Sequence, residues 1–264
     1  MFGAIAGDII GSVYEAHWIK TKDFPLLDPR SRFTDDSVLT IAVARAILDA
    51  APYATAVKEI GRAYPDAGYG GTFSLWLRSD DSRPYGSWGN GSAMRVSPVG
   101  LAFDTPEEVL SEARRSAEIS HDHPEGIRGA QATALAVFLA RSGSSKEEIR
   151  GEVEERFAYD MARSVDAIRP DYTFDLSCQG SVPESIIAFL DSDSYEDAVR
   201  NAVSLGGDAD TMACIAGAIA EAFYGGVPEE IARAVEERLP RDLLDITLEF
   251  CGRYYDRSSR WITE

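Results

Sequence analysis

Residues 206–224, GGDADTMACIAGAIAEAFY, contain the pattern that decides the fold class of this chain. Their large and small apolar side chains recur at steps of three, one, three, one and three, at Met212, Ile215, Ala216, Ile219, Ala220 and Phe223. This spacing lines one face of a helix and does not fit the two-residue period of a strand. It predicts a helix over 210–224 whose apolar face is buried in a core.

The same steps recur in 36–50, at Leu39, Ala42, Val43, Ala46, Ile47 and Ala50. Further helices are predicted over 3–15, 106–120, 125–141, 146–168, 184–190, 195–204, 228–238 and 241–255. Pro106, Pro183 and Pro228 are expected near first-turn positions, where proline is tolerated. No run of β-branched and aromatic residues alternates as a strand requires. We therefore predict an all-α fold, with a single compact multi-helix domain over 1–264 and a long loop over the glycine-rich segment 68–92.

Composition and charge exclude several classes of protein. The 264 residues are 45% apolar and 27% charged, as in ordinary globular proteins rather than disordered or fibrous chains. With 26 basic and 44 acidic residues the net charge is −18, which favours solubility and disfavours general nucleic-acid binding. Three cysteines without CxxC spacing, Cys178, Cys214 and Cys251, predict neither a disulfide framework nor a zinc site.

The first ten residues are apolar, but they carry Asp8 and no basic residue, which argues against a signal peptide. No stretch reaches the length that is needed to span a bilayer. We therefore expect a cytoplasmic protein that does not contact membranes. A monomer is favoured, because no long apolar surface pattern stands out.

Two acidic clusters each stand at the start of a predicted helix. Thr34-Asp35-Asp36 precedes the stripe that begins at Leu39, and Asp208-Ala209-Asp210-Thr211 precedes the stripe that begins at Met212. Helix capping explains one acid per helix, but not two acids and a threonine at both. Brought together, these oxygens would suit hard cations such as Mg²⁺, and without a cation the carboxylates would repel one another. An EF-hand is excluded, because Ile219 occupies the position of its terminal glutamate.

Three further segments carry polar groups with a weaker signal. The loop Trp88-Gly89-Asn90-Gly91-Ser92-Ala93-Met94-Arg95 offers glycines, N–H groups that cradle phosphate, and an arginine that pairs with a phosphate or an acid. Asp8 and Glu15 stand seven residues apart in the predicted helix 3–15, hence on one face, and Asp8 is interpreted as structural. His121 is by itself interpreted as structural, since no third soft ligand for zinc stands nearby.

Taken together, these segments resemble the ADP-ribosylglycohydrolase family, which includes dinitrogenase reductase-activating glycohydrolases and ADP-ribosylarginine hydrolases. A further segment, Cys178 to Ser185, looks like a family segment that lines the cleft. The matching motifs follow in order from Gly7-Asp8-x-x-Gly11-x-x-x-Glu15 through Thr34-Asp35-Asp36, Gly89 to Arg95, and His121 with Pro124-Glu125-Gly126, to Gly207-Asp208-Ala209-Asp210-Thr211.

The resemblance implies a site with two Mg²⁺ ions, for which Mn²⁺ can substitute. By motif position the metal ligands would be Thr34, Asp35, Asp36, Asp208, Asp210 and Thr211. The residues that take part in catalysis would be Asp35, Asp36, Glu15 and Asp210. Those expected to bind the substrate are Asn90, Gly91, Ser92, Met94, Arg95 and His121, with Trp88 (or Tyr85) stacked on adenine.

The implied reaction is hydrolysis of the glycosidic bond between ADP-ribose and an acceptor. An arginine side chain of a modified protein is the first expectation for the acceptor; serine, nucleic acid and small molecules are alternatives. Asp35, Asp36 or Glu15 would transfer the proton. A non-catalytic ADP-ribose-binding or structural relative, and a magnesium-dependent nucleotide phosphohydrolase, are the rival functions.

Overall fold

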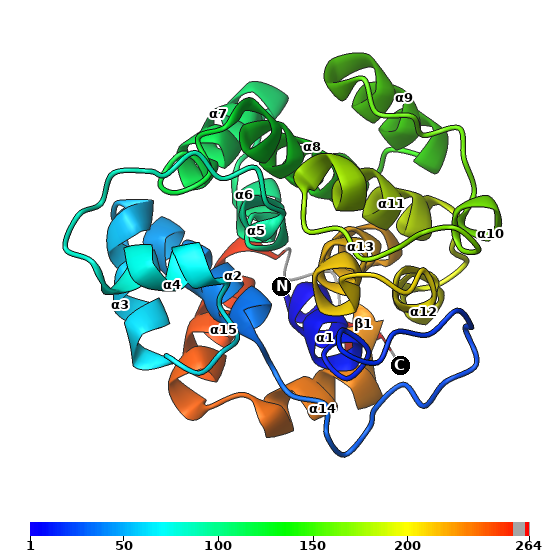
Figure 1. Ribbon diagram of the computed structural model, residues 1–264, viewed down its shortest axis with the longest axis horizontal. Helices are drawn as coiled ribbons and strands as arrows, with labels where there is room; N and C mark the ends of the chain where they lie inside the picture. Colours follow the sequence, from blue (N-terminus) through cyan, green and yellow to red (C-terminus); the bar gives the residue numbers. More distant parts are fainter. Residues whose placement is uncertain (256–261, 264) are drawn as a thin grey trace.

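Helices form nearly all of the regular structure in the described residues, which are 1–255 and the backbone of 262–263 of this computed structural model (Figure 1). The helices are α1 (Phe2–Gly11), α2 (Asp35–Leu48), α3 (Tyr53–Ala63), α4 (Gly71–Arg78), α5 (Gly91–Met94), α6 (Ser97–Ala102), α7 (Pro106–Ala117), α8 (Pro124–Arg141), α9 (Lys146–Phe157), α10 (Val165–Ile168), α11 (Cys178–Leu190), α12 (Tyr195–Ser204), α13 (Ala209–Tyr224), α14 (Glu229–Arg238) and α15 (Arg241–Tyr254). The prediction of an all-α fold is confirmed.

Helices α1 and α13 pack against each other near the centre of the molecule (Figure 1). Three glycines at four-residue spacing, Gly3, Gly7 and Gly11, form the face of α1 that meets α13. A Cβ atom on these glycines would lie 2.4, 2.0 and 2.4 Å, respectively, from a carbonyl oxygen of α13. The contact is therefore one of backbone against backbone, and only glycine permits it.

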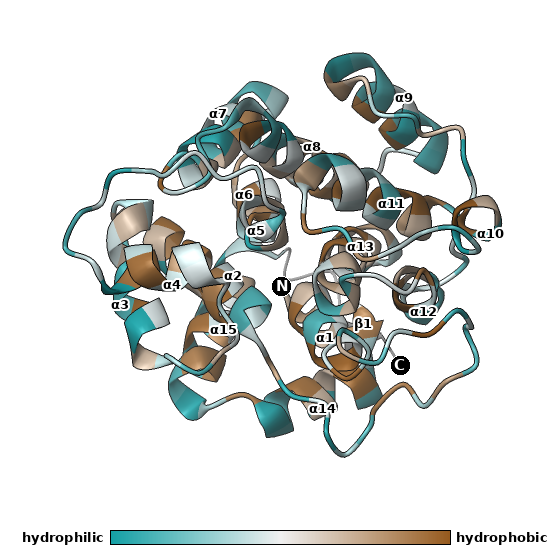
Figure 2. Ribbon diagram, in the orientation of Figure 1, coloured by the Kyte–Doolittle hydropathy of each residue, from teal (hydrophilic) through white to brown (hydrophobic). Residues whose placement is uncertain are grey.

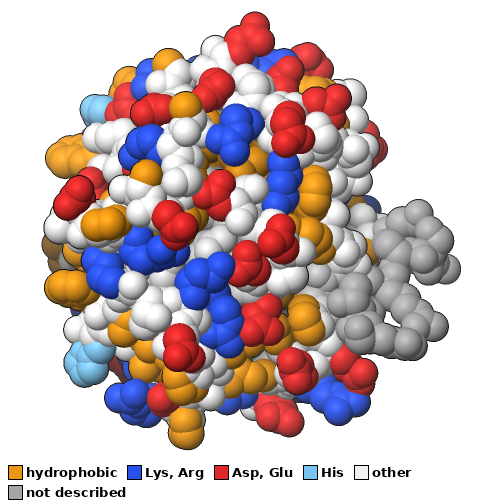
Figure 3. Space-filling view, turned by 90° about the vertical axis from the view of Figure 1, so that its right-hand side faces the viewer, with side chains coloured by type: hydrophobic (Ala, Val, Ile, Leu, Met, Phe, Trp, Pro, Cys, Tyr) orange, Lys and Arg blue, Asp and Glu red, His pale blue; other side chains and the backbone are white. Residues whose placement is uncertain are grey.

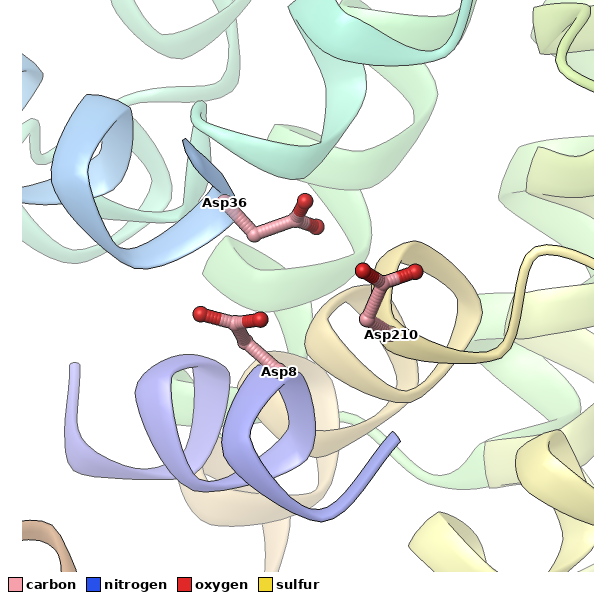
Figure 4. A group of neighbouring side chains, drawn as sticks. All are labelled: Asp8, Asp36 and Asp210. Atoms are coloured by element: carbon pink, nitrogen blue, oxygen red, sulfur yellow. The ribbon is translucent and has the colours of Figure 1, made fainter. Parts of the chain in front are cut away.

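The other helices surround this pair. Helices α8, α11 and α12 pack against α13, and α2 packs against α3, α6 and α15. Figure 2 shows apolar residues concentrated in α1, α13 and the inner faces of the surrounding helices, while α7 and α9 carry polar residues outward. This arrangement places the N-termini of α2 and α13 beside the C-terminal half of α1 (Figure 4).

One short pair of strands completes the regular structure that is described. β1 (Val227–Pro228) pairs in parallel with β2 (Ile262–Thr263). In the described part of the chain, we find no helix that combines the length and the apolar character required to cross a membrane.

The prediction of one helix over 3–15 is wrong at its C-terminal end, because α1 ends at Gly11. The hydroxyl of Ser12 donates to the Ile9 carbonyl oxygen at 2.8 Å, a bond that competes with continuation of the helix. Glu15 therefore lies in the irregular segment 12–34 and not on the face of α1 that carries Asp8.

The prediction of one helix over 146–168 is also wrong. α9 ends at Phe157, where Ala158 adopts a left-handed conformation with φ 54°. The chain starts again as α10 after Ser164, whose hydroxyl accepts from the Ala167 N–H. Apolar residues at helical spacing continue through this break, which is why periodicity alone missed it.

The segment 68–92 is not one long loop. It contains α4, which buries Phe73, Trp76 and Leu77 at helical spacing. The buried ammonium of Lys58 donates to the Trp76 and Ser79 carbonyl oxygens at 3.0 and 2.6 Å, and so satisfies the end of this helix. The glycines at the start of α4 are typical of a loop, which is why the sequence pattern did not predict this helix.

Helix α11 starts earlier than the predicted range 184–190. It begins at Cys178, after Ser177, whose hydroxyl accepts from the Gly180 N–H at 3.1 Å. Pro183 consequently lies inside the helix rather than in its first turn. Helices α3, α5 and α6 were not predicted.

The contact between α1 and α13 predicts a large effect of a single methyl group. Gly7→Ala should lower the free energy of unfolding by about 1–3 kcal/mol, because the added Cβ must separate two backbones. The exposed Gly151 in α9 is a matched control: nothing lies within 4 Å of its added Cβ. Gly151→Ala should raise stability by about 0.4–1 kcal/mol, since it reduces the entropy of the unfolded chain. Equal urea-unfolding midpoints for the two variants would contradict this packing argument.

Candidate metal centre and cleft

The polar residues at the start of α2 and α13 are only partly explained by helix capping. The Thr34 hydroxyl caps α2 by accepting from the Asp36 N–H at 3.3 Å. The Asp208 side chain, at the N-cap of α13, makes no capping bond. Asp210 accepts from the adjacent Thr211 N–H at 2.9 Å. Most of the carboxylate oxygens at the start of α2 and α13 therefore do not cap a helix.

Asp8 of α1 binds the N-terminus of α2. Its carboxylate accepts from the Thr34 N–H at 2.9 Å, from the Thr34 hydroxyl at 2.6 Å, and from the Ser37 N–H at 3.1 Å. The Ser37 hydroxyl donates to it as well. Asp8 thus satisfies N–H groups that the start of a helix leaves unpaired. These bonds give Asp8 the structural role that the sequence indicated.

Carboxylates from three helices converge at this place. Oxygens of Asp8, Asp36 and Asp210 lie within 4.8 Å of one another, and Figure 4 shows the three side chains pointing together from α1, α2 and α13. Oxygens of Glu15, Asp208 and Asp210 form a second group within the same distance. Asp210 belongs to both groups, so the two groups adjoin. Glu15 is the one exposed member, and the others are buried.

Burial is the main cause that raises the pKa of each carboxylate in these groups. Neighbouring carboxylates raise the pKa of Asp36 and Asp210 further. For Asp35, burial and the charge of Asp8 raise the pKa to about 8. A divalent cation among these oxygens would oppose all of these shifts, because it stabilises the charged form.

The residues fit a hard divalent cation. Asp36 Oδ1 is buried and has no hydrogen-bond partner among the described residues, and its Oδ2 lies 3.4 Å from the Thr211 hydroxyl. All of the grouped ligand atoms are carboxylate oxygens, and threonine hydroxyls stand beside them. Mg²⁺ and Mn²⁺ prefer such a donor set, whereas zinc sites use nitrogen and sulfur.

The acidic groups line a cleft of about 720 Å³. This volume is typical of a site that encloses one small ligand. Asp35, Asp36, Asp208, Asp210 and Glu15 all border it. The remaining walls come from the segments 67–73, 85–91 and 174–177, with Thr34, Arg32, Leu39, Met94, Arg95, His121 and Thr211.

The glycine-rich loop links the acidic groups to the rest of the cleft. The Asn90 amide donates to Asp208 Oδ2 at 2.6 Å, and the Asn90 N–H donates to the Leu176 carbonyl oxygen at 2.8 Å. A Cβ on Gly91 would lie 3.1 Å from His121 Nε2, so the glycine lets the imidazole approach the loop. Burial, together with Arg95, lowers the pKa of His121 well below its usual value, which keeps the ring neutral.

Arg95 is a fully buried cation on the wall of the cleft. Its Nη2 donates to the Ser116 carbonyl oxygen at 2.9 Å and to the Ser120 hydroxyl at 3.0 Å. Its Nε and Nη1 have no partner within the described chain. Burial lowers the pKa of Arg95 to about 10, so the side chain stays charged at neutral pH.

The other residues expected to bind substrate differ in their placement. Met94 lines the cleft and is 5% exposed, and Trp88 lines it with 55% of its surface exposed. Ser92 does not line the cleft: its side chain is fully buried, and its hydroxyl donates to the Gly126 carbonyl oxygen at 2.7 Å. Phe174 and Asp175 line the cleft although no motif indicated them, because only the folded chain brings their segment there.

The family model described as ADP-ribosylglycohydrolase matches residues 1–260. The chain is 30% identical to the ADP-ribosylhydrolase ARH3 of Mus musculus over 339 residues, which cover 97% of this chain and 91% of that protein. It is 25% identical to the ADP-ribosylarginine hydrolase Tri1 of Pseudomonas putida over 246 residues, covering 81% of this chain and 66% of that protein.

A solved structure described as an ADP-ribosylglycohydrolase-related protein complex has the same fold. It superposes with a TM-score of 0.71 at 24% sequence identity, over 94% of this chain and 95% of that chain.

The acidic cluster predicts a dependence of stability on divalent cations. Mg²⁺ at about 100 times its Kd should stabilise the fold by about 2.7 kcal/mol, which corresponds to a rise in Tm of about 5–10 °C. Asp36→Asn should abolish this rise without lowering the Tm of the metal-free protein, since it removes a buried, repelled carboxylate. The exposed Asp80→Asn should behave as wild type. If the Tm of the wild type did not change on addition of Mg²⁺, Mn²⁺ or EDTA, the prediction of a metal centre would be contradicted.

Proposed function

Because the chain belongs to the ADP-ribosylglycohydrolase family, we propose that it uses two Mg²⁺ ions to release ADP-ribose from an arginine side chain of a modified protein. That it is a glycohydrolase of ADP-ribose linkages follows from the family match and from the ADP-ribosylhydrolases to which it is similar. The number and identity of the ions, the acceptor and the role of each residue are the parts we propose.

The observation that carries the proposal is the meeting of two adjoining carboxylate groups in the wall of a ligand-sized cleft. A dedicated structural core would not bury this many acids beside an open cavity. The ligands of the two ions would be Thr34, Asp35, Asp36, Asp208, Asp210 and Thr211. When bound, the ions supply Lewis-acid stabilisation of charge on the reacting oxygens and a lowered pKa of water.

Glu15 is suited to move the proton. It is exposed at the edge of the acidic cluster, so it can exchange protons with solvent. The side chain is exposed, but its carboxylate is partly desolvated by the cleft wall. This desolvation, followed by the charge of Asp208, raises the pKa of Glu15 toward the range in which a general acid or base works best. Asp35, which also borders the cleft, is the alternative for this role.

The remaining cleft residues would bind ADP-ribose away from the acids. The Asn90 amide fixes the orientation of Asp208, and Gly91, at the start of the short helix α5, lines the cleft beside it. Ser92, which the motif also indicated, is buried behind this wall. Met94 and neutral His121 offer an uncharged wall. Trp88, which is exposed and borders the cleft, or the half-buried Tyr85, would stack on adenine.

Arginine is favoured as the acceptor by the acids at the opening of the cleft. Glu15 and Asp175 both line the cleft and would attract a guanidinium group. The relative Tri1 is named an ADP-ribosylarginine hydrolase. The two rivals make different products: a phosphohydrolase would release phosphate, and a non-catalytic relative would release nothing.

The first test is the release of ADP-ribose from arginine-ADP-ribosylated protein in the presence of Mg²⁺. Asp210→Ala should reduce kcat/KM by about 10³-fold or more, because a ligand shared by both groups is worth several kcal/mol of transition-state stabilisation. EDTA should stop release by the wild type, and Asp80→Asn should leave it unchanged. Normal magnesium-dependent release by Asp210→Ala would refute the assignment of the centre.

A second test concerns Arg95, whose unpaired nitrogens would bind the diphosphate. Arg95→Met keeps the bulk of the side chain but removes the charge, and should weaken ADP-ribose binding by about 10–100-fold, as expected for a charge-assisted hydrogen bond. Affinity for adenosine, which lacks phosphate, should stay within about twofold. Calorimetry on both ligands makes the comparison; an equal loss for both would mean that Arg95 only supports the fold.

A further inference from the structure

Four of the five exposed large hydrophobic side chains in the described residues lie in the cleft or in a hollow beside it. The five are Trp18, Leu75, Trp88, Phe174 and Leu176. Trp88, Phe174 and Leu176 line the cleft itself, and Leu75 lines a neighbouring hollow of about 430 Å³ that shares Thr72 and Tyr85 with it. Only Trp18 lines neither, although 58% of its surface is exposed.

Trp18 stands three residues after Glu15, in the irregular segment between α1 and α2. Glu15 is the one exposed member of the two carboxylate groups, so the acidic end of the cleft opens to solvent beside this segment. In the proposed function the bond is cleaved at that end, so its acceptor would lie at this opening. Trp18 is therefore an exposed aromatic residue close in sequence to the place where the acceptor leaves the cleft.

The segment that carries Trp18 is anchored to the loop that leads to Asp208. Lys20 Nζ donates to the Tyr172 and Leu205 carbonyl oxygens, both at 2.5 Å. The same ammonium lies 5.8 Å from the centre of the Trp18 ring and 5.9 Å from that of the Tyr172 ring. The indole is thus held beside a fixed cation, and an aromatic side chain that is ordered before binding loses little entropy in a complex.

Gly206 adds to this anchor. It has φ +68°, and a Cβ on it would lie 2.7 Å from the Ile19 carbonyl oxygen. The backbone next to Trp18 therefore packs directly on the backbone that leads to Asp208. The backbone on the C-terminal side of Trp18 is thus held in place relative to Asp208.

The volume of the cleft and the net charge of the protein indicate which class of acceptor molecule would contact Trp18. About 720 Å³ encloses one small ligand, so a macromolecular acceptor must stay outside the opening. The net charge of −18 repels a nucleic-acid acceptor. On the face formed by α9, α10, α12 and the segment after α1, positive and negative side chains are intermixed (Figure 3), and Lys22, Arg169 and Arg200 are paired with acids. Among macromolecular acceptors, these charges favour a polypeptide over a nucleic acid.

We propose that Trp18 contacts the polypeptide that carries the ADP-ribose, and so makes the enzyme prefer protein-linked ADP-ribose to small ADP-ribosyl compounds. The contact would be made with an apolar side chain next to the modified residue, since an exposed indole gains most by covering apolar surface. This inference rests on the proposed hydrolysis of ADP-ribose linkages.

The test compares Trp18→Ala with wild type on arginine-ADP-ribosylated protein and on ADP-ribosyl-arginine, both with Mg²⁺. For the modified protein, kcat/KM should fall by about 10-fold or more, mainly through KM, as for a hot-spot aromatic residue. For ADP-ribosyl-arginine it should stay within about twofold. Trp18→Phe should restore most of the activity on the protein, and Leu75→Ala, at the neighbouring hollow, should leave both substrates unaffected.

Two outcomes would overturn the inference. An equal loss on both substrates would mean that Trp18 only supports the segment that carries Glu15, and no loss on either would mean that nothing docks there. If the wild type cleaves neither substrate, the proposed hydrolysis fails, and affinity decides the inference instead. The contact then stands if Trp18→Ala weakens binding of the modified protein but not of free ADP-ribose, and falls if the modified protein binds both forms equally or not at all.

Discussion

The backbone contact between α1 and α13 is the constraint on which the rest of the site depends. Because Gly3, Gly7 and Gly11 carry no side chains, the two helices approach closely enough to set Asp8 beside Asp210. Asp8 then binds the N-terminus of α2 through four hydrogen bonds and brings Asp36 to the same place. One tight contact and one buried carboxylate thus align three helices that are distant in sequence.

The same arrangement places buried carboxylates close enough to repel one another when they are charged. Burial raises the pKa of these carboxylates, which means that their charged forms destabilise the folded protein unless a cation is present. The hydrogen bonds on Asp8 oppose this effect, since they lower its pKa. The carboxylates of Asp36 and Asp210 receive less such help, so the repulsion is concentrated where a cation would bind. A divalent ion bound among these oxygens would recover the stability that this repulsion costs the fold.

The sequence predicted the parts of this structure that depend on local pattern. The apolar stripes of α2 and α13, and the acids at their N-termini, were readable because both features are periodic or adjacent in the chain. What it missed depends on local exceptions to the pattern: the left-handed Ala158 that ends α9, the Ser12 bond that ends α1, and α4 behind its glycines. The sequence could not predict that Phe174 lines the cleft or that two nitrogens of Arg95 have no partner, because both facts depend on residues that are close only in the folded chain.

The cleft also shows how an acidic protein can bind an acidic ligand. ADP-ribose carries a diphosphate, and a chain with a net charge of −18 repels it at long range. Attraction must therefore come from charges inside the cleft, where solvent screens them little. Arg95 provides one such charge, buried and without a carboxylate partner, on a wall that also holds neutral His121. Cations among the acidic groups would provide the other. In the proposed mode of binding, the diphosphate of the ligand would face Arg95 and its ribose would face the acids, so the distribution of charge within the cleft would select the bond that is presented for cleavage.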